Sequence, residues 1–178
     1  PSHRVVQLQI HRLSQATLQE LKPTVIALLQ LFDPDVENIE VVSQQGVRPT
    51  LYIKQRGARL APLSAFGDGM RRILLMATTI PLCINGVLLI DELETAIHTQ
   101  ALQKTFDWLI RQCMQNNIQL LATTHSLETL DAILAVWTHD VDLVVYRQDR
   151  TTSQTTATKL DKETLTILRE ELGQEVRW

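Results

Sequence analysis

The sequence is poor in the residues that mark secreted, metal-binding or nucleic-acid-binding proteins. It has two cysteines in 178 residues, Cys83 and Cys113, and neither belongs to a CxxC pair or a Cys/His cluster with metal-ligand spacing. Its 17 basic and 20 acidic residues mix along the chain without a basic block. We therefore expect small buried cysteines in a reducing compartment, and direct binding to nucleic acid gets no support.

Long hydrophobic runs are also missing. The most apolar segment, residues 73–90, is interrupted by two threonines, a proline, an asparagine and a glycine, so it does not fit a membrane span. No basic-then-apolar signal segment opens the chain, and these absences together predict a cytoplasmic location. The first residue is Pro1 rather than methionine, which favours a trimmed, processed or partial polypeptide.

Length and composition predict one hydrophobic core. With 44% hydrophobic residues, the chain is long enough to bury one core and too short to argue for two. We expect a single α/β domain over residues 1–178. Its parts are a helix and hairpin in residues 1–60, a central α/β core in residues 61–146, and a closing strand and helix in residues 147–178.

The N-terminal part shows helical and then strand-like patterns. Apolar residues at three-and-four spacing predict a helix over residues 14–31 with Ser14 as its N-cap, in which Pro23 has to lie in the first turns or bend the helix. The apolar run at residues 39–42 and the alternating run at residues 50–54 flank a turn, so they predict a hairpin.

The central part alternates strands and helices. A glycine-bearing loop leads into a helix that is apolar on nearly all sides after Arg72, which predicts an interior helix. The runs at residues 87–90 and 118–122 flank an amphipathic pattern at residues 100–116. Strand, helix and strand at this spacing predict a parallel crossover unit.

The C-terminal part continues the α/β alternation. The patterns predict a helix over residues 126–135, a strand over residues 141–146, and a threonine-rich turn with an edge strand over residues 151–159. A closing helix over residues 161–172 is expected to use Asp161 as its N-cap.

Two consecutive carboxylates end the first central strand, in the segment VLLIDE at residues 87–92. The carboxyl end of a parallel strand is where α/β folds bind ligands. Asp91 there suits a magnesium ion bound to phosphates, and Glu92 suits the orientation and deprotonation of an attacking water. Alternatively, the two acids cap the next turn.

A histidine is expected at the same edge of the sheet. About thirty residues downstream, the next strand ends in Thr-Thr-His-Ser, which brings the imidazole of His125 to that edge. Such an imidazole is able to donate a hydrogen bond to a terminal phosphate. The alternative is a helix capped by Ser126, with His125 as an ordinary loop residue.

A serine and two glycines precede the interior helix. Ser64 supplies a hydroxyl group, and Gly67 and Gly69 leave backbone N–H groups accessible at a helix N-terminus, which favours an anion. Asp68 argues mildly against phosphate contact because its own charge repels one. The alternative is a simple glycine-containing loop with Ser64 as an N-cap.

Taken in order, three segments resemble motifs of ABC-type ATPases. LSAFGDGMRR (63–72) resembles the signature motif, VLLIDELETAIH (87–98) the Walker B motif with its D-loop, and LLATTHS (120–126) the H-loop. FGDGMRR in place of a plain LSGGQ, and the run DExExxxH, resemble soluble AAA-like ATPases related to OLD and SMC heads. The resemblance covers about residues 14–146. It implies a P-loop NTPase-like parallel sheet flanked by helices, the C-terminal portion of an ATPase head, with a short N-terminal hairpin.

The resemblance also implies a facing subunit. Ser64, Gly67 and Gly69 would contact the terminal phosphate of ATP held by that subunit, in a head-to-tail dimer that is expected to be a homodimer. Residues 96–98 lie at the D-loop, where dimer contacts are expected.

Within one subunit, the resemblance assigns three roles. Asp91 would support Mg²⁺, Glu92 would be the general base of ATP hydrolysis, and His125 would sense the terminal phosphate. Glu94 replaces a small residue of the transporter pattern and receives no catalytic role.

One motif of the family is missing. The P-loop pattern GxxxxGK[ST] occurs nowhere in the chain, although the family has it well before the signature motif. Without that amide cradle and its lysine, we expect the isolated chain to bind ATP weakly or not at all. We expect ATPase activity once a Walker A portion completes the site, with an attached or associated effector receiving the output.

Two other functions fit parts of the pattern. One is a non-catalytic regulatory or interaction module that retains an ATPase-like fold, against which the intact Asp91, Glu92 and His125 argue. The other is a metal-dependent phosphodiesterase that also uses Glu94 and His98, although no second ligand cluster appears in the sequence.

Overall fold

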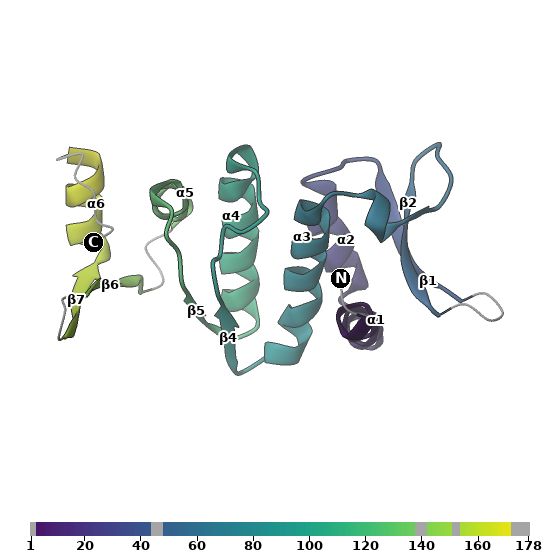
Figure 1. The fold of residues 1–178 in the computed structure, drawn as a ribbon, viewed down its shortest axis with the longest axis horizontal. Coiled ribbons are helices and arrows are strands. Elements are labelled where there is room, and N and C mark those ends of the chain that lie inside the picture. The colour runs from purple at the N-terminus through teal and green to yellow at the C-terminus, as the bar shows by residue number, and fades with distance from the viewer. Residues whose placement is uncertain (1–2, 44–47, 138–141, 151–153, 172–178) are drawn as a thin grey trace.

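A computed structural model describes residues 3–43, 48–137, 142–150 and 154–171, and it confirms a mixed α/β fold (Figure 1). The β1–β2 hairpin and the β6, β7 and α6 elements lie at opposite ends of the molecule, with α3 and α4 between them. Among the helices of the described part, none combines the length and apolar character that crossing a membrane requires.

Two helices, rather than one, open the chain. α1 spans His3–Leu18 and α2 spans Lys22–Gln30, with a left-handed residue between them at Glu20 (φ 59°). The prediction of one helix over residues 14–31 is therefore wrong. Ser14 lies inside α1 and donates its hydroxyl to the carbonyl of Ile10, so it is not an N-cap. Pro23 lies in the first turn of α2, where its missing N–H costs nothing.

An antiparallel sheet follows the two helices. β1 (Val36–Val42), β2 (Thr50–Gln55) and β3 (Ala61–Pro62) pair in that order. The expected hairpin is confirmed, with Ile39 opposite Ile53. Both of these isoleucines are buried, which fixes the register because a one-residue slip would expose them.

The interior helix is confirmed. A short 3₁₀ turn, η1 (Leu63–Ala65), leads to α3 (Asp68–Thr79), and a second one, η2 (Ile80–Cys83), follows it. Half of the α3 residues are buried, on several faces of the helix. Its central position allows it to pack on both neighbouring parts of the molecule (Figure 1).

The parallel crossover unit is also confirmed. β4 (Val87–Ile90) and β5 (Gln119–Ala122) pair in parallel, and α4 (Thr99–Gln115) connects them. The parallel sheet of the described chain consists of these two strands.

A helix and a separate hairpin end the described chain. α5 (Leu127–Val136) precedes the antiparallel pair β6 (Val144–Arg150) and β7 (Thr155–Asp161). α6 (Lys162–Thr166) begins at its N-cap Asp161, as expected, and continues into the π-helical turn η3 (Ile167–Glu171). Residues 141, 151–153 and 172, which the predicted elements include, lie outside the described residues.

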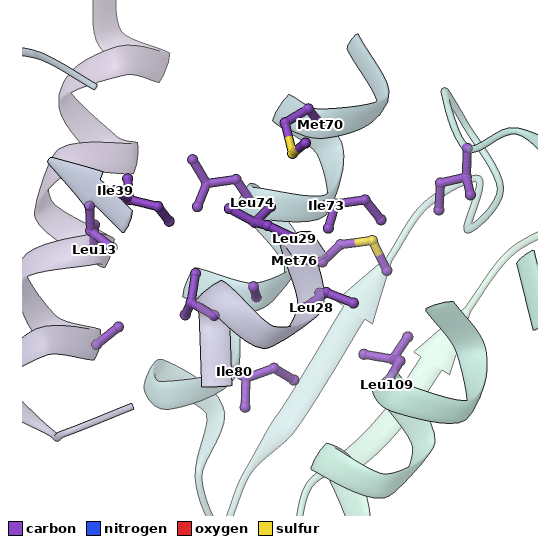
Figure 2. Close-up of a cluster of buried hydrophobic side chains, with 14 of the residues drawn as sticks. Leu13, Leu28, Leu29, Ile39, Met70, Ile73, Leu74, Met76, Ile80 and Leu109 are labelled. Carbon is purple, nitrogen blue, oxygen red and sulfur yellow. The ribbon is translucent and has the colours of Figure 1, made fainter. Parts of the chain in front are cut away.

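One main core joins the N-terminal and central parts. Figure 2 shows side chains from α1, α2, β1, α3 and α4 converging around α3. The residues labelled there include Leu13, Leu28, Ile39, Leu74 and Leu109. α5, the C-terminal hairpin and α6 share a smaller cluster formed by Leu134, Leu160 and Leu165.

Candidate functional site

The carboxyl ends of β4 and β5 meet at one edge of the parallel sheet. Ile90 lies opposite Ala122 in the register, so Asp91 and Thr123 are the first residues beyond the two strands. The two side chains are in contact, because the Thr123 hydroxyl donates a hydrogen bond to Oδ1 of Asp91. We call this edge, with the loops of residues 91–98 and 123–126, the acid rim.

Thr123 contacts four consecutive residues of the β4 end. Its backbone N–H donates to the carbonyl of Ile90 (3.0 Å), and its carbonyl accepts from the N–H of Leu93 (2.9 Å). Its Oγ1 accepts from the N–H of Glu92 (2.9 Å) while donating to Asp91. The end of β5 therefore fixes the backbone on which both acids are carried.

Glu92 adopts an uncommon backbone conformation. Its φ is 46°, in the left-handed region, which costs a non-glycine residue about 1–2 kcal/mol. Its carboxylate Oε2 accepts a hydrogen bond from the Thr95 hydroxyl at 2.9 Å. The Glu92 side chain is exposed and, among the described contacts, accepts no hydrogen bond from the backbone N–H groups that follow it. It therefore does not cap the next turn. Strained, exposed carboxylates are typical of functional sites.

Arg72 of α3 holds the opposite side of the same backbone. Its Nη2 donates to the carbonyls of Asp91 (2.8 Å) and Glu92 (3.0 Å). Its Nε is buried and has no partner among the described residues. The backbone of the acid pair is thus held from two sides. Thr123, just after β5, accepts the N–H of Glu92, and Arg72 on α3 donates to the carbonyls of both acids.

His125 lies at the acid rim, as the sequence predicted. Its backbone N–H donates to Oε1 of Glu94 at 3.2 Å, and the residue itself is exposed. The second oxygen of Glu94, Oε2, is buried without a partner in the described structure. Ser126 caps α5 by accepting the N–H of Thr129, so the capping interpretation holds for Ser126 while His125 remains at the rim.

The serine-glycine loop ends at the N-terminus of α3. The N-cap is Gly67, which provides no side-chain hydrogen bond, so Ser64 is not the cap of this helix. The helix therefore begins without a side-chain acceptor for its first N–H groups, and that end carries positive partial charge. The charge of Asp68 is countered by Arg71 at 2.9 Å, and Arg71 also donates to the carbonyl of Ser64 at 3.1 Å.

The two glycines of this loop differ in their surroundings. A Cβ at Gly69 would lie 2.8 Å from the carbonyl oxygen of Ala96, whereas a Cβ at Gly67 would meet nothing within 4 Å. Ala96 is itself left-handed, with φ 63°. The absence of a side chain at Gly69 therefore lets α3 approach the loop that follows the acids. At Gly67, contacts within the chain do not require a glycine.

The acid rim suits a Mg²⁺ ion that takes most of its ligands from phosphates and water, rather than a metal held by three or more protein side chains. In the described ranges, no group of three or more His, Cys, Asp or Glu side chains is placed to hold a metal ion. Mg²⁺ in nucleotide sites needs only one or two carboxylates because phosphates and water complete its shell. Asp91, exposed and oriented by Thr123, fits that requirement. His98 instead caps α4, where its Nδ1 accepts from the N–H of Gln100, so the phosphodiesterase cluster is not assembled.

Three residues that contact the acid pair were not predicted from the sequence to do so. Arg72, Thr95 and Thr123 each contact the acid pair, yet only Thr95 is close to it along the chain. Thr95 and Thr123 are hydroxyl residues beside the predicted loops, which is a weak signal. The contact of Arg72 depends on how α3 packs, which no local pattern reveals.

One face of the parallel sheet is open. Leu88 is buried against the core, but its neighbours Val87 and Leu89 are 50% and 73% exposed, and Leu121 on β5 is 47% exposed. Alternate residues of a strand point to opposite faces, so these three side chains share one face. We call Val87, Leu89 and Leu121 the open face.

Comparison with known proteins agrees with this architecture. The family model described as "AAA domain, putative AbiEii toxin, Type IV TA system" matches residues 4–131. An uncharacterized protein of Methanocaldococcus jannaschii, MJECL11, is 38% identical over 68 residues, which are 38% of this chain and 60% of that protein. The chain thus spans less than two thirds of this relative.

Solved structures of SMC ATPases share the fold. A chain from work on "ATP-driven dimerization and DNA stimulated activation of SMC ATPases" has a TM-score of 0.57 and 11% identity, covering 90% of this chain and 98% of that chain. The Smc head of Pyrococcus furiosus bound to the C-terminal domain of ScpA has a TM-score of 0.58 and 11% identity, covering 89% and 39%. The P-loop NTPase-like fold predicted from the motifs is therefore confirmed, its fold is similar to that of SMC ATPase heads, and this chain belongs to the AAA-domain family whose model it matches.

Proposed function

We propose that this chain is the C-terminal part of an ATPase head that hydrolyses ATP once a Walker A portion completes its nucleotide site. The observation that carries the proposal is the acid rim, where Asp91, Glu92 and the loop of His125 are joined by hydrogen bonds across β4 and β5. Family membership supports ATPase activity in general.

Each residue of the rim has a distinct task in this proposal. Asp91 supports Mg²⁺, which when bound neutralises charge on the phosphates. Glu92 accepts the proton of the attacking water, and Thr95 holds its carboxylate beforehand. His125 donates a hydrogen bond to the terminal phosphate, and Glu94 holds the backbone of its loop.

The signature loop serves a second head. Ser64 is exposed on η1, Gly67 is open, and the N-terminus of α3 begins without a side-chain cap. These features, together with the backbone N–H of Gly69 in the first turn of α3, favour binding of the terminal phosphate of an ATP molecule held by a facing subunit. We therefore propose a head-to-tail homodimer with ATP at its interface.

The proposed Walker A portion would bind at the open face. Three apolar side chains on the open face are solvent-exposed, and the two-stranded parallel sheet is too small to be stable unaided. One SMC ATPase chain of known structure is covered to 98% by this chain, so a polypeptide of similar extent occurs in a solved head structure. We propose that the upstream part of the protein, or a second chain, covers the open face and supplies the P-loop.

The output of hydrolysis falls on another part of the assembly. ATP binding would draw two heads together and cleavage would release them, which transmits force or a signal to an attached or associated effector. The Smc head of Pyrococcus furiosus is bound to the C-terminal domain of ScpA, which supports the proposal of a protein effector. We also propose a cytoplasmic location for the complex.

The test uses the head completed with its Walker A portion. We expect Mg²⁺-dependent ATP hydrolysis and ATP-dependent dimers by light scattering. Glu92→Gln should lower kcat by about 10²–10⁴-fold and trap the dimer, because it removes the base but not the binding contacts. Ser64→Glu should abolish dimerisation by repelling phosphate, whereas Ser14→Glu, at an exposed serine of α1, should not.

A regulatory module without catalysis predicts a different result. In that case the completed head would show no ATP hydrolysis, and Glu92→Gln would match the wild type in ATP binding and dimer lifetime. That outcome would overturn the ATPase proposal.

A further inference from the structure

We propose that the hydroxyl group of Thr123 is a positioning group that sets the placement of Asp91 relative to Glu92. The inference rests on the proposed ATPase function and adds to it a residue that acts through its hydrogen bonds to Asp91 and Glu92. Its basis is the pair of side-chain hydrogen bonds by which Thr123 Oγ1 joins the carboxylate of Asp91 to the N–H of Glu92.

The directions of these two bonds are fixed by chemistry. A threonine hydroxyl has one proton and two lone pairs, and an ionised carboxylate only accepts. The hydroxyl proton therefore goes to Oδ1 of Asp91, and a lone pair of Oγ1 accepts the N–H of Glu92. The chain from Glu92 N–H through Thr123 to Asp91 runs in one direction, so each bond polarises and strengthens the other.

The arrangement links two tasks that must coincide in space. In the proposed reaction, Asp91 would hold Mg²⁺ and Glu92 would orient and deprotonate the water, so an error in the placement of either residue would slow the reaction. The left-handed φ of Glu92, 46°, is a conformation that persists only when neighbouring contacts hold it. Thr123 supplies one such contact, and Arg72 supplies bonds to the carbonyls on the other side.

Loss of the hydroxyl group should leave the fold intact. Thr123 is exposed, so water is able to replace the hydroxyl at both partners, and its backbone bonds to Ile90 and Leu93 do not depend on the side chain. Thr123→Val keeps the shape and removes the hydroxyl, whereas Thr123→Ser keeps the hydroxyl. The two variants separate the hydrogen bonds from the packing.

Amide hydrogen exchange on this chain tests the bonds without nucleotide or activity. We expect Thr123→Val to accelerate exchange at the N–H of Glu92 about tenfold or more, with Thr123→Ser near the wild type. The N–H of Leu93, which is bonded to the Thr123 carbonyl, should stay protected in both. Thr124→Val is the matched control, because the Thr124 hydroxyl accepts from the N–H of Ser126, so exchange should rise at Ser126 instead.

Kinetics of the completed head tests the consequence. Thr123→Val should lower kcat about 10- to 100-fold, change KM for ATP by less than about threefold, and raise the Mg²⁺ concentration for half-maximal rate. Thr123→Ser should restore kcat to within about threefold. A Thr123→Val head with normal kcat, or unchanged exchange at Glu92 in Thr123→Val, would overturn the role of Thr123. Absence of hydrolysis by the wild-type head would instead overturn the proposed ATPase function.

Discussion

The antiparallel sheet and the parallel sheet of this protein are completed to different degrees. In β2, Leu51 and Ile53 are at most 1% exposed, because α1, α2 and α3 share one core with them. In β4, Leu88 is buried, but Leu89 beside it is 73% exposed. Each sheet therefore has one face covered within the described chain, but the uncovered face of the antiparallel sheet carries polar residues such as Glu40 and Lys54, whereas that of the parallel sheet carries the exposed apolar side chains of the open face.

This difference separates what the chain does alone from what it does with a partner. Parallel sheets normally have both faces covered, and their strands read as continuous apolar runs for that reason. VLLI of β4 is such a run, yet only one of its faces is buried. The acid rim above that sheet is nevertheless held by Arg72, Thr95 and Thr123. The chain thus holds the acids in place on a sheet whose second face is uncovered in the described residues, and the proposed Walker A portion would cover that face.

The largest expected effect contrasts two leucines of these regions. Leu74→Ala should lower the free energy of unfolding by about 2–5 kcal/mol, because Leu74 is fully buried and its removal leaves a cavity. Leu89→Ala should change it by about 0.5 kcal/mol or less in this chain, because the side chain is already largely in water. Urea unfolding of both variants measures the contrast. Equal losses would show that the open face is covered within this chain.

The next effect contrasts the two glycines before and within α3. Gly69→Ala should cost about 1–3 kcal/mol, because its Cβ would meet the Ala96 carbonyl at 2.8 Å and push α3 from the acid rim. Gly67→Ala should cost only a few tenths to about 1 kcal/mol, since its Cβ would meet open space and only the N-cap preference changes. Thermal unfolding compares them directly. A greater loss for Gly67→Ala would contradict the described contact between α3 and the loop of residues 91–98.

The smallest effect lies outside both sheets, at the N-cap of α6. Hydrogen bonds from the backbone N–H and then the side chain of Thr164 lower the pKa of Asp161 from its ordinary 3.8. Because the folded-state pKa is lowered, the stabilisation is complete above the unfolded-state pKa and is lost as the pH falls through the folded-state value. Asp161→Asn keeps a capping oxygen without this titration.

We therefore expect the difference between the melting temperatures of the wild type and Asp161→Asn to be independent of pH near neutral pH. Below about pH 4, the wild type should lose its cap stabilisation while the variant does not, so the difference between their melting temperatures should change there. Thermal scans across this range measure it. A difference that stays constant down to the lowest pH would contradict the hydrogen-bonded cap.

Local patterns sufficed for elements whose stabilising contacts are near in sequence. The cap at Asp161, the amphipathic α4 and the β4–α4–β5 crossover were predicted, and the cap at Ser126 was the alternative interpretation of its segment, because capping residues and apolar periodicity are local signals. The break between α1 and α2 was missed. The helical periodicity continues through it, and a left-handed Glu20 carries no glycine signal.

The acid rim was predictable in its residues but not in its contacts. The alternation of strands placed Asp91 and His125 at one edge, and the structure agrees. The left-handed turn at Glu92 and the reach of Arg72 from α3 arise from tertiary packing. Glu94, which had no assigned role, is found to join the two loops of the rim.

ATP titration by calorimetry tests the central claim most directly, comparing this chain alone with the same chain joined to the residues encoded upstream of Pro1. We expect no saturable binding up to about 1 mM ATP for the chain alone, and a Kd in about the micromolar range for the joined protein in the presence of Mg²⁺. Tight binding by the chain alone, with a Kd unchanged on joining, would contradict the account.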